Sequence, residues 1–540
     1  MSEPVSDPWA ATAPGMRQEE ARERVAILDF GSQFSHLIAR RVRELCVFSE
    51  LWPCRVEKEA VLRAGLKGII LSGGPSSVYE QGAPRVPEWV LTARIPVLGI
   101  CYGQQALAFH LSGEKAVARG RSGGEYGFAE LTRLDLNGGR ESPLLRGLSP
   151  TTQVWMSHGD RVETVPEGFR VAAGSKSCPI AVMEDLDRKW FGIQFHPEVS
   201  HTQEGVKLLR NFLYDVCGAH GGWEMGSFVE QSIARIRQEV GSARVVLGLS
   251  GGVDSSVAAV LLQRALGEQL TCIFVDNGLL RAGEAVEVEG TFRDHFHMNL
   301  RVVDARERFL SQLKDVADPE QKRRIIGRIF IEVFEQEARS MKRAEFLAQG
   351  TLYPDVIESS SPRGGPSVTI KTHHNVGGLP ERLGLKLLEP LRELFKDEVR
   401  RLGRELGVPE HILKRHPFPG PGLAVRCVGA VEDQDLELLR AADQIARQEL
   451  EASGYMDKTN QAFVVLLPVR SVGVMGDART YERVAVLRAV VTEDFMTADW
   501  ADLPRSLLQK ISNRIINEVR GINRVVYDIS SKPPATIEWE

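Results

Sequence analysis

The chain has few cysteines, little net charge and no long apolar run, and each shortage excludes a class of protein. Its seven cysteines are scattered without C-x-x-C pairs, so neither a disulfide framework nor a zinc site is expected, although an odd count leaves room for one reactive thiol. The longest apolar run, 462–469, has the length of a strand and cannot span a membrane. A formal net charge of -5 argues against a general nucleic-acid binder. We therefore expect a soluble, cytoplasmic protein that binds neither membranes nor nucleic acids.

At 540 residues the chain is too long for one hydrophobic core, and its character changes along its length. Residues 1–23 are polar and lack an apolar signal core, so we expect a disordered tail. From 24 to 217, strand-like and helix-like segments alternate, which predicts a doubly wound α/β domain. A glycine-rich hinge leads to a second predicted α/β domain over 218–416. The remainder, 417–540, has the mixed pattern of an α+β domain.

Individual elements follow from runs of apolar and β-branched residues and from helical periodicity. The stretches 25–31, 68–75 and 95–100 are each predicted to be a strand that leads into a turn or loop. Further predicted strands cover 245–249, 271–275, 463–469, 484–491 and 525–529. The predicted helices cover 33–44, 227–239, 435–452 and 505–520.

A glycine- and serine-rich loop follows the predicted strand 245–249 and leads into an apolar helix. It reads Ser250-Gly251-Gly252-Val253-Asp254-Ser255-Ser256. The glycines allow a tight turn beside a ligand, and the helix start offers unpaired N–H groups and the positive end of the helix dipole. Asp254 adds a carboxylate that can hold a cation such as Mg²⁺ against a bound anion. The alternative is an ordinary serine-capped turn.

No lysine follows these glycines, so the loop is not of the G-x-x-x-x-G-K-[ST] type. It resembles instead the pyrophosphate loop of enzymes that split ATP between its α and β phosphates and transfer AMP. The resemblance implies that the chain uses ATP as a co-substrate to activate a second molecule.

A second constellation combines a cysteine, a histidine and an acid. Cys101 follows the predicted strand 95–100 and has a glycine two positions away on each side, as a strained strand-to-helix elbow requires. A helix N-terminus shifts such a thiol toward the reactive thiolate. His196 ends a later apolar run, and Glu198 follows two residues on. In this chain order the three residues supply nucleophile, proton shuttle and orienting group, whereas a lone Cys101 would be a buried filler.

The Cys … His-x-Glu layout, with the stretch Ser72-Gly73-Gly74-Pro75, resembles the class I glutamine amidotransferases over about 25–216. The resemblance implies that Cys101 attacks the side-chain amide of glutamine, which releases ammonia and leaves a thioester for hydrolysis. His196 would shuttle protons and Glu198 would hold its imidazole.

The same resemblance implies an oxyanion hole made by the backbone N–H groups of Gly74 and Tyr102. One position departs from the family pattern, because Gln104 stands where we expect methionine. That difference would affect glutamine binding and leave the chemistry intact.

Nearly the whole chain is similar to the glutamine-hydrolysing GMP synthases. The resemblance implies that ATP adenylates the O2 atom of xanthosine monophosphate and that ammonia then displaces AMP to give GMP. Besides the triad and the loop, it is carried by the stretches 349–358, 370–380, 415–426, 468–481 and 532–540.

Two further groups of residues are expected to contact the substrates. A lysine and two adjacent histidines on a glycine-flanked stretch suit a lid that closes over phosphates, although a histidine pair is as often a surface accident. These lid residues are Lys371, His373 and His374. The resemblance further implies that the C-terminal domain forms a homodimer and that residues near its end hold the acceptor nucleotide. These acceptor residues are Lys532, Ile537 and Glu538.

Three other interpretations remain open from the sequence. A tRNA-modifying ATP pyrophosphatase would need a basic face and would have no use for the cysteine triad. A glutamine-dependent enzyme that amidates a carboxylate would differ only in its acceptor, and only the resemblance counts against it. A non-catalytic homologue is opposed by the intact Cys101, His196, Glu198 and Asp254.

Overall fold

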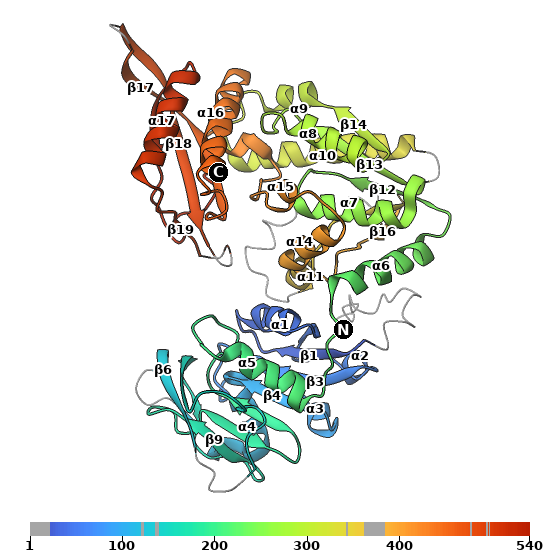
Figure 1. Cartoon of the computed structure of the whole chain (residues 1–540), viewed down its shortest axis with the longest axis vertical. Coiled ribbons are helices and arrows are strands. Elements are labelled where there is room, and N and C mark those ends of the chain that lie inside the picture. Colours follow the sequence, from blue (N-terminus) through green and yellow to red (C-terminus); the bar gives the residue numbers. More distant parts are fainter. Residues whose placement is uncertain are drawn as a thin grey trace. The chain divides into compact units, whose positions relative to one another are not determined.

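The computed structural model describes most of the chain (Figure 1). The described residues fall into two compact units, one extending to Phe228 and the other running from Val229 to Glu540. The described residues are 22–119, 124–134, 140–341, 344–360, 384–475, 478–492, 495 and 497–540.

Two expected features lie outside the described residues. One is the N-terminal tail up to residue 21. The other is the candidate lid with Lys371, His373 and His374. Their roles stay predictions.

The first unit combines strands with short helices. Its strands are β1 (Arg24–Asp29), β2 (Phe48–Pro53), β3 (Leu66–Leu71), β4 (Val97–Ile100), β5 (Val117–Ala118), β6 (Glu125–Arg133), β7 (Thr151–His158), β8 (Arg161–Val162), β9 (Arg170–Gly174), β10 (Val182–Asp185) and β11 (Trp190–Ile193). Its helices are α1 (Ser35–Glu44), α2 (Lys58–Val61), α3 (Glu88–Thr92), α4 (Tyr102–Ser112) and α5 (Gly205–Arg210).

One sheet organises this unit, in the order β2-β1-β3-β4-β11-β10-β9-β6-β7. The strands from β2 to β11 pair in parallel, and those from β10 to β7 continue the sheet in antiparallel pairing. Strands β1 and β4 are buried along almost their whole length, as central strands covered on both faces must be. Cys101 follows β4 and His196 follows its parallel neighbour β11. Both residues therefore lie at the same edge of the sheet.

The second unit alternates strands and helices before a mixed C-terminal part. Its strands are β12 (Arg244–Gly248), β13 (Leu270–Asp276), β14 (Leu300–Asp304), β15 (Ala344–Ala348), β16 (Lys386–Leu388), β17 (Gln461–Met475), β18 (Ala478–Val491), β19 (Asp499–Trp500) and β20 (Ile522–Tyr527). Its helices are α6 (Met225–Val240), which begins just before the unit, α7 (Val253–Leu266), α8 (Glu284–Glu289), α9 (Arg306–Leu313), α10 (Pro319–Ser340), α11 (Tyr353–Ser360), α14 (Lys396–Glu405), α15 (Glu410–Leu413), α16 (Asp433–Ala452) and α17 (Arg505–Glu518).

Strand β12 is the switch point of the parallel sheet β14-β13-β12-β15-β16. The chain passes from β12 to β13 and β14 on one side and later adds β15 and β16 on the other side. In open α/β sheets, ligands bind beyond the carboxyl ends of the strands at such a point. The loop 250–256 follows β12, so the fold puts it in that position.

A long hairpin forms the centre of the C-terminal part (Figure 1). Strands β17 and β18 pair antiparallel from Gln461–Val490 out to Met475–Ala478. The sequence predicts only the inner segments 463–469 and 484–491, because the outer half of the hairpin is poorly buried. Backbone pairing between the two strands extends them beyond the core.

One hydrophobic core joins the parallel sheet to the C-terminal part. Phe334 of α10, Leu439 of α16 and Val464 of β17 all belong to it. The predicted fold class, two α/β domains followed by an α+β region, is confirmed. The domain boundaries expected at 217/218 and 416/417 stay predictions. Across the residues described, no helix is long and apolar enough to cross a membrane.

Candidate active sites

Cys101 lies at the turn between β4 and α4 in a backbone conformation that L-residues rarely adopt. Its φ and ψ are 52° and -108°, and the residue is buried. A Cβ added to Gly99 would lie 2.7 Å from the carbonyl oxygen of Gly103, and one added to Gly103 would overlap the carbonyl oxygen of Leu71. The elbow therefore requires glycine at both positions, and it sets the thiol at the start of the helix.

His196 is held in place from several directions. Its Nδ1 lies 2.7 Å from Oε1 of Glu198, its backbone N–H donates to the carbonyl oxygen of Trp155 at 3.1 Å, and its carbonyl oxygen accepts from the hydroxyl of Thr202 at 2.5 Å. Because an ionised carboxylate can only accept, Nδ1 carries the proton that faces Glu198. The imidazole also interacts with the thiol of Cys101, for which Nε2 remains.

The surroundings of His196 favour its protonated form. Burial lowers the pKa of His196, but the negative charges of Glu198 and Cys101, together with the hydrogen bonds to both, outweigh burial. The pKa of His196 therefore lies well above its ordinary value of 6.5. An imidazolium beside a thiolate is the pairing that activates a cysteine nucleophile.

The pair Gly73-Gly74 forms one wall of this site. A Cβ added to Gly73 would lie 3.2 Å from Cε1 of His196 and 3.7 Å from Cβ of Cys101, so the backbone passes close to both residues. A Cβ added to Gly74 would lie 3.4 Å from the ring of Tyr102. The backbone of Gly74 therefore lies against the ring of Tyr102, and the oxyanion hole that their N–H groups would form stays a prediction.

Two groups beside the thiol are missed by reasoning from the sequence. The carbonyl oxygen of Ser157 lies 3.4 Å from Sγ of Cys101, and Nε2 of Gln194 lies 3.7 Å from it. Gln194 is held in turn by Gln105, because Nε2 of Gln105 donates to Oε1 of Gln194 at 3.2 Å. The one available signal is that Gln194 lies two positions before His196, directly after β11 ends at Ile193.

The loop 250–256 joins β12 to α7 through a left-handed glycine. Gly251 has a φ of 74°, a conformation that favours glycine. The hydroxyl groups of Ser250 and Ser255 lie 2.9 Å apart, and the backbone N–H of Ser250 donates to the Ser255 hydroxyl at 3.2 Å. The helix begins at Val253, so its N-terminal N–H groups belong to the loop and suit an anion.

Asp254 is paired with a lysine to which no motif points. Its Oδ2 lies 2.5 Å from Nζ of Lys396, the first residue of α14. Its Oδ1 is buried and has no hydrogen-bond partner among the described residues. Lys396 is 142 positions away in the sequence, so another element of the fold supplies the lysine that the loop itself lacks.

Two more distant stretches pack against the same loop. A Cβ added to Gly350 would lie 3.3 Å from the carbonyl carbon of Asp254, so the stretch 349–358, which carries part of the family resemblance, meets the loop there. Arg415 donates from Nη1 to the carbonyl oxygen of Gly251 at 2.8 Å. Arg415 is missed by sequence reasoning because only the folded chain brings it to the loop.

The three candidate acceptor residues lie in different environments on the last segment of the chain. Ile537 is buried, and Oε1 of Glu538 lies 2.9 Å from Nη2 of the buried Arg426. Lys532 is half-buried, and its Nζ donates to the carbonyl oxygen of Phe495 at 2.7 Å. The structure thus buries Ile537 and leaves Lys532 and Glu538 partly exposed.

Three protein-family models match successive parts of the chain. The model of the class-I glutamine amidotransferases matches residues 26–216. The NAD synthase model matches 226–323, and the model of the GMP synthase C-terminal domain matches 448–539. The triad lies within the first match and the loop 250–256 within the second.

Relatives cover almost the whole chain. A glutamine-hydrolysing GMP synthase of Thiobacillus denitrificans is 56% identical over 526 residues, which are 96% of this chain and 100% of the relative. That of Idiomarina loihiensis is 54% identical over 96% of this chain and 98% of its own length, and that of an Azoarcus species is 55% identical over 96% and 100%. The family expected from the sequence is confirmed, and the chain belongs to the glutamine-hydrolysing GMP synthases.

Proposed function

We propose that the chain synthesises GMP from xanthosine monophosphate, ATP and ammonia that it releases from glutamine. The observation that carries the proposal is the combination, in one chain, of the Cys101–His196–Glu198 cluster with a pyrophosphate-type loop at the switch point of a second sheet. Ammonia in neutral water is mostly protonated and non-nucleophilic, so its release and its use must be coupled. The other products are AMP, pyrophosphate and glutamate.

In the first unit, Cys101 attacks the amide carbon of the glutamine side chain. His196 is protonated because of its charged neighbours, and it gives its proton to the departing ammonia. Glu198 holds the imidazole through Nδ1. The N–H groups of Gly74 and Tyr102 stabilise the negative oxygen of the tetrahedral intermediate, and water then hydrolyses the thioester.

In the second unit, the loop 250–256 binds the pyrophosphate part of ATP. The serine hydroxyls and the first N–H groups of α7 donate to phosphate oxygens, and Lys396 exchanges its contact with Asp254 for one with the phosphates. The O2 atom of xanthosine monophosphate attacks the α phosphate and pyrophosphate leaves. Ammonia then displaces AMP. Positioning and charge neutralisation account for most of this catalysis.

Asp254 is the residue that we assign to Mg²⁺. Its buried Oδ1 has no donor among the described residues, and a carboxylate oxygen is a ligand that Mg²⁺ prefers. The described residues contain no group of three or more metal-ligating side chains, so Mg²⁺ would take its other ligands from substrate phosphates and water. When bound, Mg²⁺ would neutralise charge on the leaving pyrophosphate.

The acceptor nucleotide is assigned to the surroundings of the C-terminal segment. The guanidinium groups of Arg281 and Arg426 lie 4.4 and 5.1 Å from the ring centroid of Phe418. Nη1 of Arg426 is buried and has no hydrogen-bond partner in the described part of the chain. Guanidinium groups suit a nucleotide phosphate, and Lys532 offers a further cation from the segment itself. Ile537 and Glu538 are assigned to other parts of the nucleotide, because a carboxylate cannot donate to a phosphate.

The outer part of the β17–β18 hairpin is where we place the contact between two subunits. Val469, Val472, Val474 and Tyr481 are all more than half exposed there. Exposed apolar side chains gathered on one element mark an interaction surface, and a second copy of the chain would bury them. Light scattering should therefore show a dimer for the wild type and a monomer for Val472→Asp.

The cytoplasm is the compartment in which we place the enzyme. All seven cysteines are free, including the nucleophile Cys101. A reducing compartment keeps thiols in this state.

The experiment that tests the proposal measures pyrophosphate release from ATP and Mg²⁺, with ammonium as the nitrogen donor. Xanthosine monophosphate is present in one arm and absent in the other, and the nucleotide product is identified by mass. The proposal requires release that depends on xanthosine monophosphate and yields GMP. Release that ignores this nucleotide would overturn the assignment of the acceptor.

A further inference from the structure

Lys322 of α10 is a lysine with no exposure to solvent. Its Nζ donates to the carbonyl oxygens of Ala424 at 2.9 Å and Cys427 at 2.8 Å, and it pairs with Oε2 of Glu540 at 2.5 Å. All three ammonium hydrogens therefore have acceptors. A buried ammonium group is costly unless it is paired in this way, so its location calls for an explanation.

Glu540, the last residue of the sequence, is bound through both oxygens of its side chain. Oε2 accepts from Lys322, and Oε1 accepts from the backbone N–H of Gly429 at 2.9 Å. The side chain is only 7% exposed. Because Gly429 belongs to the stretch just after Cys427, Lys322 and Glu540 draw this stretch and the chain end together.

Every residue from Ile537 to Glu540 has its own anchor. Ile537 packs in a small apolar cluster, Glu538 pairs with Arg426, and the indole N–H of Trp539 donates to Asp528 at 3.0 Å. These residues belong to no helix or strand, so side-chain contacts hold the segment in place. The Lys322–Glu540 pair is the anchor at the end of the segment, and it helps to fix the path of the backbone that carries Ile537 and Glu538.

We infer that Lys322 is a positioning residue for the acceptor-nucleotide site and that it acts through the carboxylate of Glu540. The inference rests on the proposed function, since Ile537 and Glu538 matter here only as contacts of the acceptor. Lys322 comes from a helix of the parallel-sheet region, whereas the segment that it holds belongs to the C-terminal part. The contact thus couples the region that binds ATP to the segment that binds the acceptor.

The test compares Glu540→Gln, Glu540→Ala and Lys322→Met with the wild type, using ammonium as nitrogen donor. Glu540→Ala removes both anchoring bonds and should raise the KM for xanthosine monophosphate about tenfold, the size expected for a hydrogen bond to a charged group. Glu540→Gln keeps an acceptor for Gly429 and should raise it less. The KM for ATP should stay within about twofold, because the loop 250–256 is untouched.

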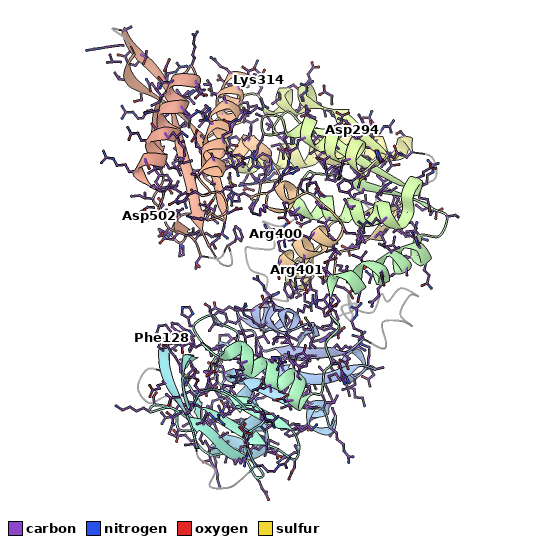
Figure 2. The ribbon with its side chains drawn as sticks, in the orientation of Figure 1. Phe128, Asp294, Lys314, Arg400, Arg401 and Asp502 are labelled. Atoms are coloured by element: carbon purple, nitrogen blue, oxygen red, sulfur yellow. The ribbon has the colours of Figure 1, made fainter. Side chains whose placement is uncertain are left out.

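Two controls separate positioning from general damage. Lys314→Met makes the same change at an exposed lysine of the same unit (Figure 2) and should leave both KM values unchanged. The double variant Lys322→Met/Glu540→Gln should be no worse than Lys322→Met alone, because both changes break one interaction. If Lys322→Met fails to fold, the two Glu540 variants still decide the matter.

The outcomes are distinct. An unchanged KM for xanthosine monophosphate in Glu540→Ala would overturn the inference. So would an equal rise of both KM values, which would indicate a merely structural role. A wild-type enzyme that does not use xanthosine monophosphate would instead overturn the proposed function, whatever the variants do.

Discussion

The two candidate active sites differ in how completely they are assembled before a substrate arrives. Cys101, His196 and Glu198 are all buried, and bonds within the first unit hold the histidine. In the second unit, the side chains of Asp254 and Lys396 are 29% and 46% exposed and are paired with each other. The first site is a buried cluster, and the second is a partly exposed loop whose two charged side chains form an ion pair with each other.

The difference follows from the substrates. Glutamine offers a neutral amide, so the first site must supply the nucleophile, the proton and the oxyanion donors in fixed positions. ATP brings several negative charges of its own, so the second site needs only groups that can turn toward them. Under the proposed function, ATP phosphates would draw Lys396 away from Asp254, whose Oδ1 is without a partner among the described residues.

The largest effect is expected from Cys101→Ala, which should remove the glutamine-dependent activity and leave the ammonium-dependent activity intact. Glutamine-dependent GMP formation should fall by roughly 10⁴-fold or more, because no other group can form the thioester. Ammonium-dependent formation should stay at the wild-type rate. The measurement is GMP production with each nitrogen source, and Cys54→Ala serves as the matched control at a half-buried thiol. Loss of both activities would contradict a two-site enzyme.

Asp254→Asn should impair the ATP site and spare the glutaminase site, with the rate of pyrophosphate release reduced about 10²–10³-fold. The substitution keeps the size of the side chain but removes the charge that pairs with Lys396 and that we assign to Mg²⁺. Pyrophosphate release should fall with glutamine and with ammonium alike, whereas basal glutamine hydrolysis should persist. Normal pyrophosphate release would show that the carboxylate serves neither the metal nor the lysine. Asp397→Asn, at the second residue of α14, is the matched control.

Glu198→Gln should weaken the glutaminase site by about 10²-fold and change its dependence on pH. The carboxylate charge helps to raise the pKa of His196, so its removal lets burial lower that pKa. The imidazolium then loses its proton at a lower pH, and the alkaline limb of kcat/KM for glutamine moves to lower pH. A pH profile of glutamate release measures the shift. An alkaline limb that stays in place would show that Glu198 does not set the pKa of His196. The control is Glu204→Gln, at a half-exposed glutamate, which should leave the pH profile unchanged.

The smallest effect is expected from Gln104→Met, which restores the residue anticipated for the family. Nε2 of Gln104 donates to the carbonyl oxygen of Ile180 at 3.2 Å, and its buried Oε1 has no hydrogen-bond partner among the described residues. Losing one bond while removing one unsatisfied acceptor should change the free energy of unfolding of the first unit by less than about 1 kcal/mol. Urea denaturation measures it. The sequence predicts an effect of position 104 on glutamine binding, but the contacts of Gln104 are directed at Ile180 and not at the thiol, so we now expect the KM for glutamine to stay unchanged.

The parts of each site that are close in sequence could be predicted from it. The elbow around Cys101, the spacing of His196 and Glu198 and the loop 250–256 are local patterns, since strand ends and helix starts bring their residues together. The outer half of the β17–β18 hairpin could not be predicted, because its strands are extended by pairing with each other and not by an apolar pattern of their own. Lys396 and Arg415 carry no signal that connects them to the loop either, because only tertiary contacts bring them to it.

The amino-acid sequence by itself determined the kind of chemistry: a cysteine at a glycine elbow, a histidine two residues before a glutamate, and an anion-binding loop at a helix start. Only the tertiary structure decided which charged groups distant in the sequence lie beside one another. Lys396 meets Asp254 across 142 positions, Arg426 meets Glu538 across 112, and Lys322 meets Glu540 across 218. Residues so far apart meet only when a common core brings their elements together. A charge needs a specific partner only where the fold buries it, so the sequence alone does not indicate which residue that partner is.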